Sequence, residues 1–174
     1  MADLQYAALL ALLVPACAMD LWRHRIPNYL SYPGLLVGLA LGLLLGGLAG
    51  LGNHVLGLFA AAIPLYVMFL GGSLGGGDVK LMAAVGAITG FPSALNALFA
   101  SILVGGFCAA LILIWQGRLL GLAQYTLGHM RYRAGWSNLP PDPPAARRDA
   151  FPFGVAIALG TLLAVPAPSL LTTG

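Results

Sequence analysis

The sequence predicts an all-α protein that crosses a membrane several times, and two observations support this prediction. Hydrophobic residues make up 60% of the 174 residues and charged residues only 7%, against about 25% charged residues in ordinary soluble domains. Residues 26–77 and 81–117 contain no charged side chain, and about 20 apolar residues suffice for one helical crossing. Helices are expected because they satisfy their own backbone hydrogen bonds in lipid. The composition therefore excludes a water-soluble enzyme.

Charged residues and glycine or proline punctuation divide the apolar sequence into six predicted crossings. They cover residues 4–20, 29–50, 55–71, 78–90, 94–116 and 151–171. We expect a tight polar turn at residues 52–54 between the second crossing and the third. Residues 117–150 form the remaining polar region, with an amphipathic helix over 118–133 followed by a proline-rich loop. A region this short cannot bury a core of its own, so we expect one membrane-embedded domain over residues 1–174.

The basic residues predict the orientation of these crossings. If the N-terminus lies outside and each segment crosses once, the loops 21–28 and 71–78 and the region 117–150 face the cytoplasm. All eight basic residues then fall on the cytoplasmic side, as the positive-inside rule requires: Arg23, Arg25, Lys80, Arg118, Arg131, Arg133, Arg147 and Arg148. The expected partner of these charges is the lipid bilayer, and nucleic acid is not an expected partner.

The same topology brings two of the five aspartates to the cytoplasmic face. Asp20 closes the first crossing and Asp78 opens the fourth, with two crossings between them. The run from Asp78 to Gly90 is about 13 residues long, or about 20 Å, whereas the hydrocarbon core is about 30 Å thick. A carboxylate below the surface must face water or the bundle interior, and it is a functional candidate. The ordinary alternatives are a solvated acid past a helix end for Asp20 and a helix N-cap for Asp78.

Two carboxylates at one membrane face suggest the chemistry of an aspartic-protease dyad. Like charges at short range cannot both stay ionised, so one carboxyl keeps a proton. The ionised partner can deprotonate an attacking water while the protonated one donates to the oxyanion or the leaving amine. The sequence leaves open which aspartate plays which role. Gly75 and Gly77, beside Asp78, would let a substrate backbone come close.

These motifs resemble those of the type IV prepilin peptidases. Asp20 is followed by Arg-Ile-Pro-Asn at residues 25–28, and residues 75–80 read Gly-Gly-Gly-Asp-Val-Lys. The second motif matches the GxGD signature of membrane aspartyl proteases, and Phe-Pro-Phe-Gly at residues 151–154 resembles the C-terminal motif of the family. The short chain is most similar to the TadV/CpaA branch, which processes Flp-type pilins.

The resemblance implies a membrane aspartic endopeptidase with Asp20 and Asp78 as its catalytic residues. Its substrates would be type IV or Flp-type prepilin and pseudopilin precursors, cleaved at the cytoplasmic face of the bacterial inner membrane. Longer family members carry paired CxxC zinc ligands and also methylate the new N-terminus. This chain has only the isolated cysteines Cys17 and Cys108. We therefore expect no metal, no other cofactor and no N-methyltransferase activity.

Two further polar residues are candidates for a supporting role near the dyad. Lys80 is either a simple cytoplasmic anchor or a cation that tunes the charge of the dyad. Asn28 is most simply the N-cap of the second crossing, where Pro27 fixes the turn. With Gly75 and Gly77, these residues complete the candidate site.

Several other interpretations remain open from the residues alone. Ser73 and Lys80 could form a Ser/Lys dyad, although this would leave both aspartates unexplained. His24 could bind a metal with Asp78 or His129. At the level of function, intramembrane aspartates also occur in small proton-coupled transporters, and a structural assembly subunit is a third possibility that would tolerate loss of both acids.

Overall fold

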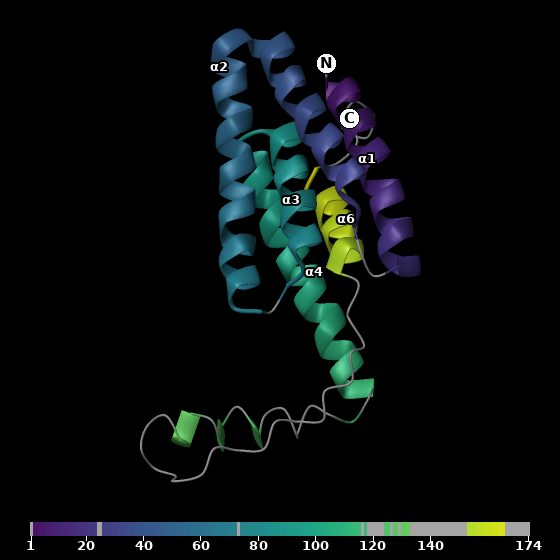
Figure 1. The fold of residues 1–174 in the computed structure, drawn as a ribbon, viewed down its shortest axis with the longest axis vertical. Helices are drawn as coiled ribbons and strands as arrows, with labels where there is room; N and C mark the ends of the chain where they lie inside the picture. Colours follow the sequence, from purple (N-terminus) through teal and green to yellow (C-terminus); the bar gives the residue numbers. More distant parts are fainter. Residues whose placement is uncertain are drawn as a thin grey trace, which may run out of the picture. The chain divides into compact units, whose positions relative to one another are not determined.

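The structure is a computed structural model, and the elements that it describes are helices (Figure 1). The described residues are 2–23, 26–72, 74–115, 117, 124–125, 127–128, 130–132 and 153–165. The helices are α1 (Ala2–Arg23), α2 (Asn28–Leu70), α3 (Gly76–Thr89), α4 (Ser93–Trp115) and α6 (Phe153–Ala164). Among them, α1, α2 and α4 are long and apolar enough to cross a membrane. The predicted class is confirmed at this level, while the number of crossings and their orientation stay predictions.

Helix α2 consists of two arms that meet at Gly47, where the chain reverses direction (Figure 1). Gly47 has φ 59° and ψ −147° within an otherwise helical segment, a conformation that is open to glycine but strained for other residues. The second arm returns along the first, so that Gly50 contacts the backbone of Gly42. The polar turn expected at residues 52–54 is therefore wrong, because these residues are helical and the reversal occurs at Gly47.

Helix α3 packs closely against both arms of α2. A Cβ atom on Gly38 of the first arm would lie 2.5 Å from the backbone of Ala87, and the backbones of Gly57 and Gly86 are in direct contact. These distances leave no room for a side chain, so the glycines allow the helices to approach at backbone distance. α3 runs parallel to the first arm and antiparallel to the second, because the contacting pairs progress in those directions along the chain.

Asn53 and His54, in the second arm of α2, form hydrogen bonds at the C-terminal end of α3, the end far from Asp78. The backbone N–H of Phe91 donates to Asn53 Oδ1 at 3.0 Å. The buried ring of His54 places Nδ1 2.6 Å from the carbonyl oxygen of Ala87 and 3.1 Å from that of Gly38. Since both neighbours are acceptors, Nδ1 must carry the hydrogen. The polar residues therefore bind α3 and do not mark a turn, which explains the misplaced prediction.

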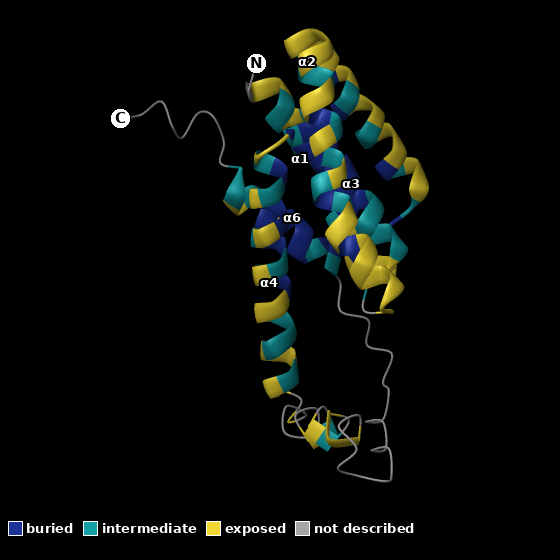
Figure 2. Ribbon diagram, turned by 90° about the vertical axis from the view of Figure 1, so that its left-hand side faces the viewer, coloured by how far each residue is buried: buried dark blue, intermediate teal, exposed yellow. Residues whose placement is uncertain are grey.

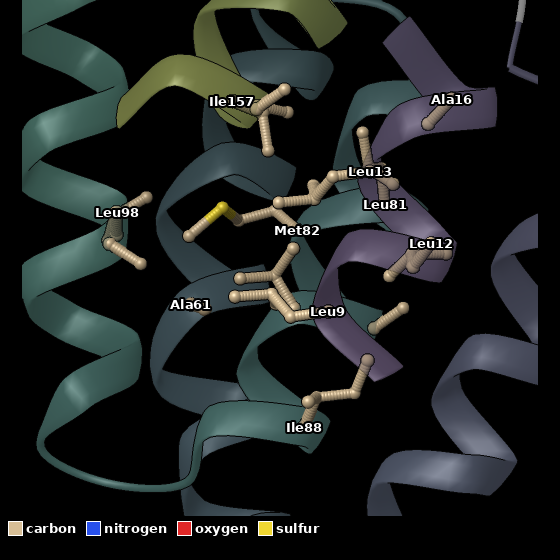
Figure 3. Close-up of a cluster of buried hydrophobic side chains, with 14 of the residues drawn as sticks. Leu9, Leu12, Leu13, Ala16, Ala61, Leu81, Met82, Ile88, Leu98 and Ile157 are labelled. Atoms are coloured by element: carbon tan, nitrogen blue, oxygen red, sulfur yellow. The ribbon is translucent and has the colours of Figure 1, made fainter. Parts of the chain in front are cut away.

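The core lies where α1, the second arm of α2, α3, the beginning of α4 and α6 meet (Figure 3). Its largest buried side chains include Leu9, Leu13, Leu81, Met82, Ile88, Leu98 and Ile157. Helices α4 and α6 run antiparallel here, with Gly160 against the backbone of Ser101 and the ring of Phe153 against Gly105. Exposed residues line the outward faces of the helices (Figure 2). Many of them are large and apolar, as on a lipid-facing surface.

The chain divides into two compact units, residues 1–105 with 152–174 and residues 106–151. The core and the helix contacts described above belong to the first unit. In the second, the structure describes the end of α4 and a few residues between 117 and 132, of which those from 124 onward are helical. The predicted amphipathic helix over 118–133, the proline-rich loop and the end of the last predicted crossing therefore lie largely outside the described residues.

Candidate active site

Asp20 lies inside α1, which continues as far as Arg23. Its side chain is only 4% exposed, so the interpretation as a solvated acid past a helix end is wrong. The last turn of α1 extends beyond Asp20, and α6 covers the carboxylate from the other side. A Cβ atom built on Gly154 would lie 2.7 Å from Oδ2 of Asp20 and 3.1 Å from its carboxyl carbon. The burial of Asp20 therefore depends on a residue from the far end of the chain.

Gly154 lies in the first turn of α6, whose first residue is Phe153. Because glycine has no Cβ, the Asp20 carboxylate can approach the backbone of this turn directly. The N-terminus of a helix carries unsatisfied N–H groups and the positive end of the helix dipole, and both favour a negative charge. Gly154 belongs to the Phe-Pro-Phe-Gly motif noted in the sequence, but the sequence does not predict a role for this residue. Its contact with Asp20 joins segments that lie far apart in the chain.

Asp78 lies in the first turn of α3 and is partly buried. The N-cap is Gly75, not Asp78, and the N–H of Gly75 donates to Oδ2 of Asp78 at 3.3 Å. An acid at the third helical position that bonds back to the N-cap residue is half of the familiar capping box. The interpretation of Asp78 as the N-cap is therefore wrong, because the N-cap lies three residues earlier, at Gly75. Its carboxylate is tied to glycine-rich backbone on one side and keeps acceptor capacity on the other.

Ile26, in the connection between α1 and α2, links the surroundings of the two acids. This buried side chain lies 3.2 Å from the position of a Cβ on Gly77, which precedes Asp78. Its Cδ1 lies 3.0 Å from the position of a Cβ on Gly154, which covers Asp20. The structure thus brings Asp20 and Asp78 into one site, where α1 ends and where α2, α3 and α6 begin.

The side chain of Lys80, in α3, contacts that of Asn28, in α2. Lys80 Nζ donates to Asn28 Oδ1 at 2.9 Å and lies 5.5 Å from the centre of the Tyr32 ring. Asn28 is the first residue of α2, and the N-cap is Pro27, which makes no side-chain cap. The prediction of Asn28 as an N-cap is therefore wrong. The sequence does not predict this pairing, because nothing in it shows that α2 and α3 begin side by side.

The remaining candidates are placed as follows. Gly75 is exposed beside the Asp78 carboxylate, and Gly77 packs on Ile26. Ser73, His24 and His129 lie outside the described residues. Across the part of the chain that the structure describes, no three His, Cys, Asp or Glu side chains are grouped as a metal site would need.

A family model described as the type IV leader peptidase family matches residues 7–110, a segment that contains Asp20, Asp78 and the contact of Lys80 with Asn28. The chain is 37% identical over 102 residues to the prepilin leader peptidase/N-methyltransferase of Aeromonas hydrophila. The alignment covers 55% of this chain and 35% of that protein, so the chain spans about a third of the length of this relative. No solved structure matches the chain.

Proposed function

The chain belongs to the type IV leader peptidase family, and we propose that it is a membrane aspartic endopeptidase that removes the leader peptides of prepilins. The observation that supports this most strongly is the gathering of Asp20 and Asp78 in one site. Asp20 lies under Gly154, and Asp78 lies beside Gly75, with Ile26 in contact with both surroundings. Burying two acids near each other is costly, and catalysis offers a reason for that cost.

The proposed reaction uses both carboxyl groups and one water molecule. The ionised carboxylate takes a proton from water as the water oxygen attacks the peptide carbonyl carbon. The protonated carboxyl donates to the developing oxyanion and, as the C–N bond breaks, a proton passes to the leaving amine. As the tetrahedral intermediate collapses, one of its hydroxyl groups returns a proton to the dyad. The dyad therefore ends with one proton, as it began, and the products are a carboxylate on the leader and an ammonium group at the new N-terminus of the pilin.

The proposed setting is the cytoplasmic surface of the bacterial inner membrane. We infer six crossings in one membrane-embedded domain, with the two arms of α2 as separate crossings and the N-terminus outside. α3 has 14 residues, or about 20 Å, which is shorter than a hydrocarbon core of about 30 Å. If α3 reaches the outer surface, Asp78 lies below the inner one. Such a depth suits a bond between a cytoplasmic leader and a transmembrane segment.

The proposed substrates are type IV or Flp-type precursors, including pseudopilins, as in the short TadV/CpaA branch. We also propose that the chain does not methylate the product, although the Aeromonas relative carries both activities in its name. This second statement rests on the absence of paired cysteines from the sequence.

Cleavage by purified protein in detergent tests the proposed function. A synthetic precursor that contains a basic leader and the first apolar segment of a pilin is incubated with the protein, and products are identified by mass spectrometry. A detergent solution holds no ion gradient, so a proton-coupled transporter would show no turnover there. Cleavage at one bond between leader and apolar segment supports the peptidase, and an intact precursor under every condition of lipid and pH would contradict it.

A further inference from the structure

The first turn of α2 contacts both helices that carry the proposed catalytic acids. On one side, the hydroxyl of Tyr29 donates to the sulfur of Met19 at 3.3 Å, directly before Asp20 in α1. On the other side, Lys80 Nζ donates to Asn28 Oδ1 at 2.9 Å, two residues beyond Asp78 in α3. The turn therefore holds contacts to the immediate neighbours of both acids.

The direction of the Lys80 side chain decides what it does. Residues two apart in a helix point to nearly opposite sides, since each step turns the chain by about 100°. Lys80 accordingly reaches α2 and not the Asp78 carboxylate, whose resolved hydrogen bond comes from the Gly75 N–H. A direct role as proton donor to the dyad does not fit this arrangement.

Two different interactions hold the Lys80 ammonium on α2. The amide oxygen of Asn28 accepts one of its three hydrogens, and the ring of Tyr32, one helical turn further on, lies 5.5 Å from Nζ. A cation over a tyrosine face is attracted by the ring quadrupole. Because Asn28 and Tyr32 are four residues apart, they lie on one face of α2. Together they form a single binding site for the ammonium group of Lys80.

We propose that Lys80 is a positioning residue that acts through Asn28 and Tyr32 to hold the Asp78 turn at its working distance from Asp20. The proposal rests on the proposed function, because it assigns a role in the same site. The buried side chain of Ile26 packs between the two regions that carry the acids. The exposed hydrogen bond of Lys80 with Asn28 joins the starts of α3 and α2 beside it. Displacement of a reacting group by about 1 Å can lower a rate about a hundredfold, so a contact of this kind has a measurable effect.

Cross-linking measures the separation of the acids without relying on proteolysis. In a background with Cys17→Ser and Cys108→Ser, the pair Asp20→Cys and Asp78→Cys is treated in membranes with a short bifunctional thiol reagent. Lys80→Met and Asn28→Ala should each lower the yield of cross-linked protein severalfold, and the combination should lower it no further. Asn28→Asp, which keeps an acceptor for Lys80, should retain the yield. Asn53→Ala, a matched substitution at the opposite end of α3, should leave it unchanged.

Cleavage rates in the natural-cysteine protein give the second measurement. Lys80→Met and Asn28→Ala should lower kcat about ten- to a hundredfold with little change in KM, and Asn28→Asp and Lys80→Arg should restore most of the rate. Asn28→Ala keeps every charge, so a Lys80 that served only as a cytoplasmic anchor would leave this variant fully active. Normal cross-linking and cleavage by Asn28→Ala, or additive losses in the double variant, would overturn the proposal. If the unaltered protein cleaves no precursor, the proposed function fails, while the cross-linking still reports on the positioning role.

Discussion

The carboxylate of Asp20 lies against the backbone of Gly154, so closely that a Cβ atom at residue 154 would come within 2.7 Å of Oδ2. This contact joins the end of α1 to the first turn of α6 and buries the acid. It gives the C-terminal Phe-Gly pair a physical role, since any larger residue would push the carboxylate from its place. The site is therefore closed by a residue that lies outside the segment matched by the family model.

Gly154→Ala is expected to lower the rate of precursor cleavage about a hundredfold, because the new methyl group displaces the Asp20 carboxylate from its position. Membrane insertion should be retained. The measurement is the cleavage rate at equal amounts of folded protein. Gly52→Ala is the matched control, since a Cβ at this helical position meets nothing within 4 Å. Equal activity of the two variants would argue against this placement of Asp20.

Ile26→Ala is expected to cost both stability and activity. The substitution keeps the Cβ that lies against Gly77 but removes Cδ1, which packs beside Gly154. Core truncations of this kind cost about 2–5 kcal/mol. The thermal unfolding midpoint in detergent should fall, and the remaining folded protein should cleave more slowly because the Gly154 turn that covers Asp20 loses its packing against Ile26. Leu163→Ala, whose side chain is 73% exposed, serves as the control and should change the midpoint little. A normal cleavage rate for Ile26→Ala would show that the acids do not depend on this contact.

His54→Ala is expected to separate stability from activity. The substitution removes the buried contact of Nδ1 with Ala87 and Gly38 and should cost about 1–3 kcal/mol of unfolding free energy. His54 contacts the C-terminal end of α3, whereas Asp78 lies at the N-terminal end. The cleavage rate per folded molecule should therefore stay normal at low temperature. An unfolding midpoint equal to that of the unaltered protein, together with lost cleavage, would contradict this division.

Cleavage without methylation is expected for the product. The purified protein is incubated with a precursor and S-adenosylmethionine, and the mass of the mature segment is determined. We expect the mass of the unmodified segment, because Cys17 and Cys108 are far apart in the sequence and form no CxxC pair. A mass increase of one methyl group that depends on the added methyl donor would contradict the prediction.

The helices were predictable where a local signal ends them. The predicted crossing over residues 94–116 corresponds to α4, Ser93–Trp115, because glycine and proline precede it and polar residues follow. The position of the reversal in α2 was not predictable in the same way. Gly46, Gly47, Gly50 and Gly52 lie close together, and each can adopt the required conformation. Asn53 was a misleading signal, since a polar side chain in an apolar tract suggests a turn but here binds the backbone of Phe91.

The candidate site was predictable in its residues more than in its contacts. Asp20, Asp78, Lys80 and Asn28 stand out because polar residues are scarce in this chain. Their partners depend on which helix ends lie side by side, and no local pattern encodes that arrangement. Only the folded structure therefore shows that Lys80 donates a hydrogen bond to Asn28 and that Gly154 packs on the carboxylate of Asp20.

Single carboxamide substitutions test the central claim most directly. Asp20→Asn and Asp78→Asn each keep the side-chain shape and remove one of the two acids, while Asp3→Asn makes the same change at an exposed residue in the first turn of α1. All three proteins are purified from membranes, and their rates of precursor cleavage are measured at equal amounts of folded protein. We predict no detectable cleavage by Asp20→Asn or Asp78→Asn and a normal rate for Asp3→Asn. A normal cleavage rate in either of the first two variants would contradict the assignment of Asp20 and Asp78 as the catalytic pair.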